Sequence, residues 1–380
     1  MLYQRVVPEK MNIRRPRAVI VLVASGILFC LCYLQIVKKV IKINIESLVL
    51  RNTVDSNPDA WWTSVLCKGK TNETFKKIVL PLLMRDITPG LDNNVFLVES
   101  ACKSTPTYRA WCAVESFARE NPKAEVWYVM TTSAVNNTNG LPGRLLDHYP
   151  NLHVVSADLD MVFNNTLLEE FFTSGAWYRN TPWPMIQISD LLRVLLVWRY
   201  GGFYSDTDTV CLKSISPLKN VIVTSTGDRN HIANGVFHFT NRHEFITFIM
   251  STMTKMYSPR AWGSMGPNTF NRCTREYCKL PNLQSLFPKE REDPIKCGNI
   301  TVLPEYYLLP YPWNQYRKIF REGGWKNFIA THKKTYAIHA YGKVNGGMLI
   351  KVGSNSIYEG ASRTFCPISY FHATANSSVF

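Results

Sequence analysis

Acidic residues are scarce in this chain of 380 residues, with 28 Asp and Glu against 43 Lys and Arg, so the formal net charge is +15. The sequence contains no internal repeats and no low-complexity segments, which excludes a solenoid and a disordered chain. It also lacks a Gly-x-Ser-x-Gly nucleophile elbow and a P-loop, so neither of the enzyme classes that depend on these motifs is expected. Hydrophobic residues, at 46%, and aromatic residues, at 12%, are sufficient for one sizeable buried core.

The positive charge is spread along the sequence, and no basic stripe or nucleic-acid-binding motif accompanies it. Nucleic acid is therefore not an expected partner. We expect the charge to serve anionic nucleotides, acidic glycans or the membrane surface.

Residues 18–37 are twenty residues without a formal charge, long enough to cross about 30 Å of hydrocarbon as a helix. A cleaved signal peptide is the alternative, but the run exceeds the usual apolar core of a signal and no small-x-small cleavage site closes it. All sequons for N-glycosylation follow this run, at Asn72, Asn136, Asn164, Asn299 and Asn376. We therefore expect a cytosolic tail at residues 1–17, a transmembrane signal-anchor at 18–37 and a luminal body.

Two of the ten cysteines lie in this span, and the other eight are an even number in an oxidising compartment. We expect several disulfides among them, with Cys102 and Cys112 as the best local pair. Zinc is the competing interpretation for Cys273, Cys278 and Cys297, but their spacing lacks a second close pair.

Strand-like segments rich in β-branched and aromatic residues alternate with helix-like segments after residue 93. The strands are predicted at 94–98, 125–131 and 152–156, and the helices at 108–120 and 186–200. Alternation of this kind indicates an α/β domain with a mostly parallel sheet, whose ligand crevice lies at the carboxyl ends of the strands.

An apolar helix, a double glycine and a pair of carboxylates follow one another between residues 188 and 208. Ser189 is predicted to cap this helix, and Gly201 to end it in the left-handed conformation. A strand predicted from Phe203 to Leu212 would place Asp206 and Asp208 on one face, because successive side chains alternate between faces. Two such carboxylates suit Mg²⁺ or Mn²⁺, which bind oxygen ligands and bridge to phosphates.

Asp190 and Arg193 are three residues apart, so they are neighbours on one face of the predicted helix. The carboxylate can accept hydrogen bonds from a sugar hydroxyl, and the guanidinium can bind phosphate. A surface ion pair is the alternative interpretation, which the apolar residues around them disfavour.

A second Asp-x-Asp triplet, Asp158-Leu159-Asp160, lies next to a sequon and has no glycine-terminated helix before it. An isolated triplet of this kind is a weak signal. We therefore expect it in a turn or at a solvated strand end.

The segment from Ser189-Asp190-x-x-Arg193 to Gly201-Gly202-x-Tyr204-x-Asp206-x-Asp208 resembles the signature of a known family. The family is that of the DXD-containing retaining glycosyltransferases, with lactosylceramide alpha-1,4-galactosyltransferase and alpha-1,4-N-acetylglucosaminyltransferase. Further similarity lies at 96–100, 112–118, 234–237, 243–245, 266–267, 311–313 and 336–339. The resemblance extends from about residue 94 to about residue 366, and it is specific to the family but not to a substrate.

The resemblance implies a single-domain GT-A fold, a Rossmann-like and mostly parallel sheet that binds a nucleotide sugar, at residues 94–380. Residues 38–93 would form a luminal stem, in which Trp61-Trp62 is either a packing pair or a membrane-interface pair. The family also implies a Golgi membrane protein of type II that uses a UDP-sugar with Mn²⁺ or Mg²⁺ and retains the configuration at the anomeric carbon.

On this resemblance, Asp190 would orient the donor sugar and Arg193 would support the departing phosphates. Asp206 and Asp208 would hold the metal ion. The catalytic residues would be Asp190, Arg193 and Asp208. His339 is either a further metal ligand or a packed histidine.

The remaining candidates for substrate binding are Tyr204, Asn234, Gly235, Gly266 and Pro267. Gly235 permits close approach of the backbone to a ligand, but Asn234 and the Gly266-Pro267 pair are equally consistent with turns. Trp262 and Trp313 offer flat faces for stacking on a sugar, although core packing is the commoner role of tryptophan.

The expected function is metal-dependent transfer of a hexose or N-acetylhexosamine, above all alpha-1,4-linked galactose or N-acetylgalactosamine, to the terminal sugar of a glycosphingolipid. One alternative is an alpha-1,4-N-acetylglucosaminyltransferase acting on O-glycans. The alternative from another class is a catalytically inactive Golgi protein that binds glycans or a partner. A homo- or hetero-oligomer in the Golgi is left open.

Overall fold

The computed structural model describes residues 60–68, 76–226, 230–287, 293–345 and 347–380. The predicted tail and transmembrane segment, and the predicted stem up to residue 59, lie outside the described residues. None of the helices in the described ranges is long and apolar enough to cross a membrane.

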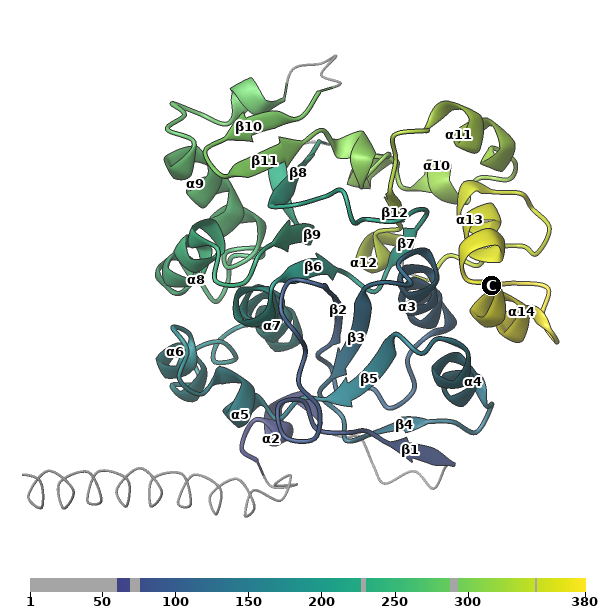
Figure 1. Cartoon of the computed structure of the whole chain (residues 1–380), viewed down its shortest axis with the longest axis horizontal. Helices are drawn as coiled ribbons and strands as arrows, with labels where there is room; N and C mark the ends of the chain where they lie inside the picture. Colours follow the sequence, from purple (N-terminus) through teal and green to yellow (C-terminus); the bar gives the residue numbers. More distant parts are fainter. Residues whose placement is uncertain (1–59, 69–75, 227–229, 288–292, 346) are drawn as a thin grey trace, which may run out of the picture. The chain divides into compact units, whose positions relative to one another are not determined.

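A mixed sheet forms the centre of the described body (Figure 1). Its eight described strands lie in the order β10-β11-β8-β9-β6-β2-β3-β5. Their bounds are Asn94–Glu99 (β2), Glu125–Met130 (β3), Leu152–Ser156 (β5), Gly202–Ser205 (β6), Val221–Ser225 (β8), His231–Phe239 (β9), Ile295–Cys297 (β10) and Ile300–Leu303 (β11). All of these strands run in one direction except β9 and β10, which are antiparallel to their neighbours. The predicted α/β class and mostly parallel sheet are confirmed.

Helices cover both faces of this sheet. The longer ones are Tyr108–Glu120 (α3), Leu141–His148 (α4), Pro184–Tyr200 (α7), Glu244–Met256 (α8), Pro267–Tyr277 (α9), Ile357–Phe365 (α13) and Pro367–Thr374 (α14). Shorter ones are Thr63–Leu66 (α2), Leu159–Phe163 (α5), Glu169–Thr173 (α6), Arg317–Phe320 (α10), Trp325–Thr331 (α11) and Gly342–Asn345 (α12), with 3₁₀ turns at Gln284–Leu286, Glu305–Tyr307 and Trp313–Gln315. Lys77–Val79 (β1) pairs with Ala134–Asn136 (β4), and Thr209–Cys211 (β7) pairs with Ala337–His339 (β12).

Alternation along β2 shows how the sheet is buried on both faces. Phe96 and Val98 join the apolar cluster under α7, α8 and α9, whereas Val95 and Leu97 join the cluster under α3 and α4. A strand that is buried on both faces is apolar at successive positions, which explains the continuous apolar sequence of β2. The predicted strands β2, β3 and β5 and the predicted helix α3 are found within one residue of their expected ends.

The helix α7 begins earlier than predicted. Pro184 occupies its first turn after Trp183, so Ser189 lies inside the helix and does not cap it. Proline is favoured at the first helical position because it has no N–H to leave unpaired. The predicted end at Gly201 is confirmed, but its φ of +68° and ψ of 160° are not the predicted left-handed helical conformation, although the positive φ still favours glycine.

The start of the body also lies earlier than predicted. Trp62, Leu66 and Leu83, all in the expected stem, are buried in the cluster under α7, and the ring of Trp61 lies 5.1 Å from that of Phe172. The tryptophan pair is therefore a packing pair. Aromatic side chains contribute much of the apolar area of a core, so this segment is part of the folded body.

Disulfides join distant parts of the chain. Within the described residues they are Cys67–Cys102, Cys112–Cys366 and Cys278–Cys297, and Cys211 and Cys273 are free. The predicted Cys102–Cys112 pair is wrong, because Cys102 bonds to Cys67 and Cys112 bonds to Cys366. The zinc interpretation is also wrong, since two of its three cysteines form a disulfide with each other.

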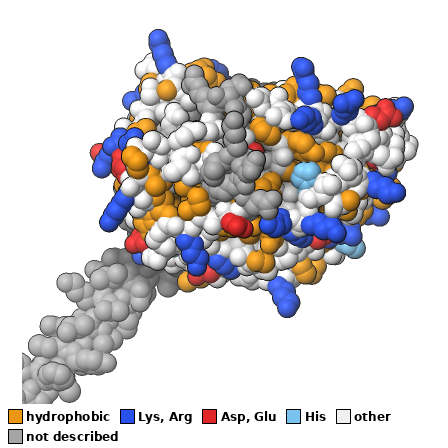
Figure 2. All heavy atoms as spheres, turned by 90° about the horizontal axis from the view of Figure 1, so that it is seen from above, with side chains coloured by type: hydrophobic (Ala, Val, Ile, Leu, Met, Phe, Trp, Pro, Cys, Tyr) orange, Lys and Arg blue, Asp and Glu red, His pale blue; other side chains and the backbone are white. Residues whose placement is uncertain are grey.

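Charged side chains are distributed over the surface. On the face seen in Figure 2, the described Lys and Arg side chains stand between apolar and neutral ones and form no continuous stripe. This distribution matches the even spread of basic residues along the sequence.

Candidate active site

The carboxylates of Asp206 and Asp208 lie on a turn between two sheets. β6 pairs with β2 and β9 in the central sheet, whereas β7 pairs antiparallel with β12, so the chain leaves the central sheet after Ser205. The predicted continuous strand from Phe203 to Leu212 is therefore wrong. The N–H of Asp206 donates a hydrogen bond to the carbonyl oxygen of Gly235 (2.8 Å), which fixes the beginning of the turn.

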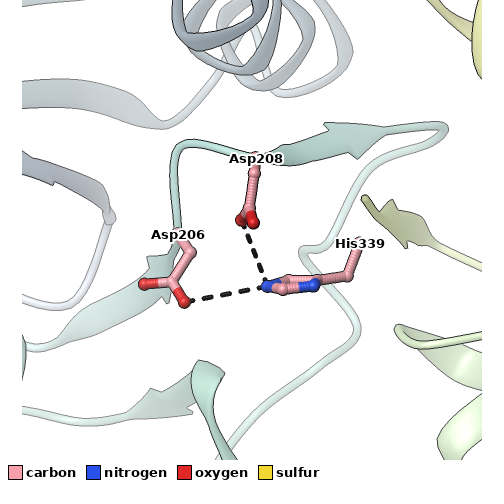
Figure 3. Close-up of side chains that lie close together, drawn as sticks. All are labelled: Asp206, Asp208 and His339. Carbon is pink, nitrogen blue, oxygen red and sulfur yellow. Dashed lines mark ion pairs between the residues drawn. The ribbon is translucent and has the colours of Figure 1, made fainter. Parts of the chain in front are cut away.

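His339 reaches the same turn from β12. The register of β12 on β7 places His339 opposite Thr209, the residue after Asp208. Its Nε2 lies 3.1 Å from Oδ1 of Asp208 and 3.7 Å from Oδ2 of Asp206 (Figure 3). One ligand atom from each of the three residues lies within 4.8 Å of the others, close enough to hold one ion.

The chemistry of these three side chains fits a divalent cation. Oδ2 of Asp208 accepts a hydrogen bond from the N–H of Gly342 (2.6 Å). Oδ1 of the same carboxylate is buried and accepts no hydrogen bond from any described residue, although it lies in ion-pair range of His339. A buried, unpartnered carboxylate oxygen beside a second carboxylate and an imidazole is a donor set that suits Mn²⁺ or Mg²⁺.

Arg193 connects the two acidic parts of the site. Its guanidinium lies 3.3 Å from Oδ1 of Asp190 and 3.0 Å from Oδ1 of Asp206, and it donates to the carbonyl oxygen of Asn234 (2.9 Å). It also donates to the hydroxyl of Ser189 (2.9 Å) and lies 4.7 Å from the ring of Tyr204. The side chain is buried, so its main contacts are with the protein and it holds both carboxylates in place.

The charges of the site act on one another because the paired groups lie 3.0–3.7 Å apart and Asp190, Arg193 and His339 are largely buried, although Asp206 and Asp208 are 31% and 27% exposed. Burial raises the pKa of Asp190 to about 6, against the lowering effect of Arg193. Burial also acts to raise the pKa of Asp206, but Arg193 and His339 outweigh it and the net pKa is lowered. For His339, burial lowers the pKa while Asp208 and Asp206 raise it, and the carboxylates prevail. Without a metal ion, the two carboxylates therefore favour proton uptake by the imidazole.

The amide of Tyr341 orients the imidazole from the other side. Its N–H donates to Nδ1 of His339 at 3.3 Å, a long hydrogen bond in which Nδ1 is the acceptor. Binding of an ion through Nε2 would place the ring proton on Nδ1, so this contact with the N–H of Tyr341 would have to be given up.

Close approaches of backbone explain two of the predicted glycines. A Cβ on Gly235 would lie 2.6 Å from Oδ2 of Asp206, and one on Gly266 would lie 2.5 Å from Nδ2 of Asn234 and 2.9 Å from Oδ2 of Asp190. Nδ2 of Asn234 donates to Oδ1 of Asp190 (2.8 Å). The glycines thus let the side chains of the site approach the backbone, and Gly266 begins the turn into α9.

The predicted site residues therefore form one continuous group. Its members are Asp190, Arg193, Tyr204, Asp206, Asp208, Asn234, Gly235, Gly266 and His339. Pro267, the last predicted residue, is the first residue of α9. The hydroxyl of Tyr204 donates to Oδ1 of Asp206 (2.7 Å) and is buried, so Tyr204 supports the carboxylate. Trp262 is 55% exposed four residues before Gly266, and Trp313 is partly buried. Sequence reasoning missed the roles of Tyr341 and Gly342, although their positions two and three residues after His339 were a usable signal.

Comparison with known proteins gives two family matches. Residues 107–228 match the glycosyltransferase sugar-binding region containing the DXD motif, and residues 238–373 match the alpha 1,4-glycosyltransferase conserved region. The two matched ranges include the residues grouped in the site except Asn234 and Gly235, which lie between them.

Relatives and solved structures are similar over most of the chain. Human lactosylceramide 4-alpha-galactosyltransferase is 28% identical over 74% of this chain and 77% of its own length, and human alpha-1,4-N-acetylglucosaminyltransferase is 25% identical over 73% and 79%. Among solved structures, galactosyltransferase LgtC in complex with donor and acceptor sugar analogs has 12% identity, covers 73% of this chain and 95% of its own, and gives a TM-score of 0.35. The apo structure of the bifunctional glycosyltransferase WbbM has 12% identity, coverage of 76% and 50%, and a TM-score of 0.39.

Proposed function

Because this chain belongs to the glycosyltransferases that combine a DXD sugar-binding region with an alpha 1,4-glycosyltransferase region, we propose that it transfers a sugar from a UDP-sugar donor with retention of configuration. The donor sugar is galactose or N-acetylgalactosamine, the new linkage is alpha-1,4, and the acceptor is the terminal sugar of a glycosphingolipid. The single observation that carries the proposal is the convergence of Asp206, Asp208 and His339 on one point.

Each part of the site has a role in this reaction. Asp206, Asp208 and His339 would hold Mn²⁺ or Mg²⁺, which, when bound, neutralises the diphosphate of the leaving group. Arg193 keeps Asp206 directed to this point, since its guanidinium lies 3.0 Å from that carboxylate.

Asp190 is placed to orient the donor sugar. Its Oδ1 accepts from the amide of Asn234 and lies next to Arg193, which keeps the carboxylate in one rotamer. A fixed carboxylate can bind a hydroxyl of the donor sugar in one orientation. The anomeric carbon is then presented to the acceptor sugar, which lowers the entropic part of the barrier. The developing positive charge at that carbon is stabilised by the nearby carboxylate charge.

The printed names of the relatives support the choice of substrates. The galactosyltransferases act on lactosylceramide, as their name states, and they are 27–28% identical to this chain in human and mouse. The N-acetylglucosaminyltransferase, at 25%, favours the alternative activity only slightly less. An inactive glycan-binding or partner protein is less consistent with the site, because such a protein has no need for a charged ion site with an unpartnered carboxylate oxygen.

The location follows from the same proposal. We propose a GT-A domain in the Golgi lumen, anchored as a type II protein by residues 18–37. Disulfides and sequons after residue 37 support a luminal body.

The test uses the full chain in detergent with Mn²⁺, a panel of UDP-sugars, and acceptors that end in lactose or in N-acetylhexosamine. Mn²⁺-dependent formation of an alpha-linked product from UDP-galactose or UDP-N-acetylgalactosamine on the lactosyl lipid is the expected result. Transfer of N-acetylglucosamine to O-glycans would favour the alternative enzyme. A folded protein that binds neither Mn²⁺ nor UDP would contradict the proposal and favour the partner protein.

A further inference from the structure

The segment after β12, residues 340–345, closes over Asp208 without supplying a ligand of its own. The N–H of Ala340 donates to the carbonyl oxygen of Asp208 (2.8 Å), and the N–H of Gly342 donates to its Oδ2 (2.6 Å). Both the main chain and the side chain of Asp208 are therefore held by this segment. With Oδ2 bonded to the backbone, Oδ1 is the oxygen left for an ion.

This segment contains a turn that its own sequence does not favour. Tyr341 has a φ of +56°, a left-handed conformation that costs about 1–2 kcal/mol for a residue with a side chain. The N–H groups of Val344 and Asn345 donate to its carbonyl oxygen (2.8 and 2.9 Å), and its hydroxyl donates to the carbonyl oxygen of Tyr311 (2.7 Å). Hydrogen bonds within the turn, and one to Tyr311 outside it, thus keep the N–H of Gly342 directed at Asp208.

Asn345 closes the turn with a buried side chain. It is 5% exposed, and its Nδ2 donates to the carbonyl oxygen of Ala340 (2.9 Å). Its Oδ1 accepts from the N–H of Gly347 (3.1 Å) and lies 3.4 Å from Nη1 of Arg109. Loss of this amide would leave the carbonyl oxygen of Ala340 without its donor and would free the turn.

Arg109 ties this turn to a long helix. It belongs to α3, and its guanidinium lies 5.6 Å from the ring centroids of both Phe320 and Tyr358. It also donates to the carbonyl oxygen of Met348. The chain of contacts therefore runs from α3 through Arg109 and Asn345 to Ala340, two residues before Gly342, whose N–H binds the carboxylate of Asp208.

We propose that Asn345 and Arg109 are positioning residues for the cation site, although neither belongs to the group Asp206, Asp208 and His339 that would hold the cation. They set the affinity for the divalent cation by keeping the N–H of Gly342 on Oδ2 of Asp208. This inference rests on the proposed cation site at Asp206, Asp208 and His339. Residues that orient metal ligands in this way typically change metal affinity by about 10–100-fold when they are removed.

A purely structural role would have a different signature. Loss of a buried amide lowers the free energy of unfolding wherever it occurs, but it changes cation affinity only if it supports the ligands. Asn151 is the matched control, because it is 9% exposed and its Nδ2 donates to the carbonyl oxygens of Ala118, Asn121 and Ala124. It belongs to the loop before β5, at the amino end of that strand, whereas Asp206 follows the carboxyl end of β6.

The experiment is a titration of the full chain in detergent with Mn²⁺, in which free Mn²⁺ is followed by electron paramagnetic resonance. The variants are Asn345→Ala, Arg109→Gln, the milder Arg109→Lys and the control Asn151→Ala, each with its Tm. We expect the dissociation constant for Mn²⁺ to rise about 10-fold or more in Asn345→Ala and Arg109→Gln and less in Arg109→Lys. In Asn151→Ala we expect a lower Tm and a dissociation constant for Mn²⁺ within about 2-fold of that of the wild type.

The activity assay adds a second readout. In Arg109→Lys the Mn²⁺ concentration for half-maximal turnover should rise while kcat at saturating Mn²⁺ is retained. Unchanged Mn²⁺ affinity in both Asn345→Ala and Arg109→Gln, with normal binding by the wild type, would overturn the positioning role and leave the proposed function intact. Absence of Mn²⁺ binding by a folded wild type would instead overturn the cation site, and the positioning role with it.

Discussion

Two Asp-x-Asp triplets in this chain have the same spacing and different surroundings. Asp158 caps the short helix α5, where its Oδ1 accepts from the N–H groups of Asp160 (3.0 Å) and Met161 (3.4 Å). Asp206 and Asp208 instead converge with a histidine that lies 131 residues beyond Asp208. The same spacing thus gives a candidate cation site only in the second triplet, where a distant strand brings a third potential ligand and Oδ1 of Asp208 has no hydrogen bond from a described residue.

The largest difference between the triplets should appear on neutralising one carboxylate in each. Asp208→Asn removes a charged ligand, so we expect turnover with UDP-sugar to fall by more than about 100-fold, beyond the effect of residues that only support ligands. Asp160→Asn should leave turnover within about 2-fold of the wild type. Initial rates at saturating Mn²⁺ measure both variants, and similar losses in the two would remove the distinction between the triplets.

A single methyl group on the neighbouring backbone of Gly235 should disturb the triplet Asp206-Thr207-Asp208. In Gly235→Ala the added Cβ would lie 2.6 Å from Oδ2 of Asp206, so the carboxylate must move, and we expect Mn²⁺ affinity to fall by about 10-fold. Gly90→Ala is the control, because no heavy atom lies within 4 Å of its Cβ position. Titration with Mn²⁺ compares them, and wild-type affinity in Gly235→Ala would show that the position of Asp206 matters little.

The other triplet should respond in stability and not in activity. Asp158→Ala removes the cap of α5, which should lower the free energy of unfolding by about 1 kcal/mol, or Tm by about 2 °C. Asp147→Ala, an exposed position on α4, should change it by less than about 0.5 kcal/mol. Thermal unfolding and initial rates at 20 °C check both variants. A loss of turnover in Asp158→Ala at constant Tm would assign this triplet a role that its contacts do not suggest.

The smallest expected effect is on pH dependence. The pKa of Asp160 is raised by burial and by the charge of Asp158, against the hydrogen bond from Trp61. A raised pKa in the folded state favours folding below the ordinary value of 3.8, and this contribution is lost as pH rises through the folded pKa. Asp160→Asn should therefore be more stable than the wild type at pH 7, by a few tenths of a kcal/mol at this partly exposed position, and the difference should shrink towards pH 4. Denaturant unfolding at the two pH values measures it, and a constant difference would refute the assignment.

Local patterns predicted much of the fold. α3 and β5 have the predicted ends, and Gly201 ends α7 as expected, because apolar periodicity and glycine conformations act within a few residues. Ser189 was the wrong cap, since Pro184 and Trp183 begin the helix a turn and a half earlier. The residues of the site were predicted from the family resemblance together with the carboxylate spacing.

Long-range pairing explains what could not be predicted. The strand from Phe203 was expected to continue because nothing in its sequence shows that β7 pairs with β12. The partners of Cys102 and Cys112 lie 35 and 254 residues away, so a local pair was the wrong choice. The same pairing of β7 with β12 brings His339 to the carboxylates, which is why the sequence left its role open.

The most direct test of the account is a crystal structure of the luminal body with Mn²⁺ and UDP, with the anomalous signal of manganese used to locate the ion. The account predicts one strong peak within about 2.5 Å of Asp206, Asp208 and Nε2 of His339, next to the diphosphate. A peak at another group of residues, or UDP bound with no ion between it and these three side chains, would contradict it.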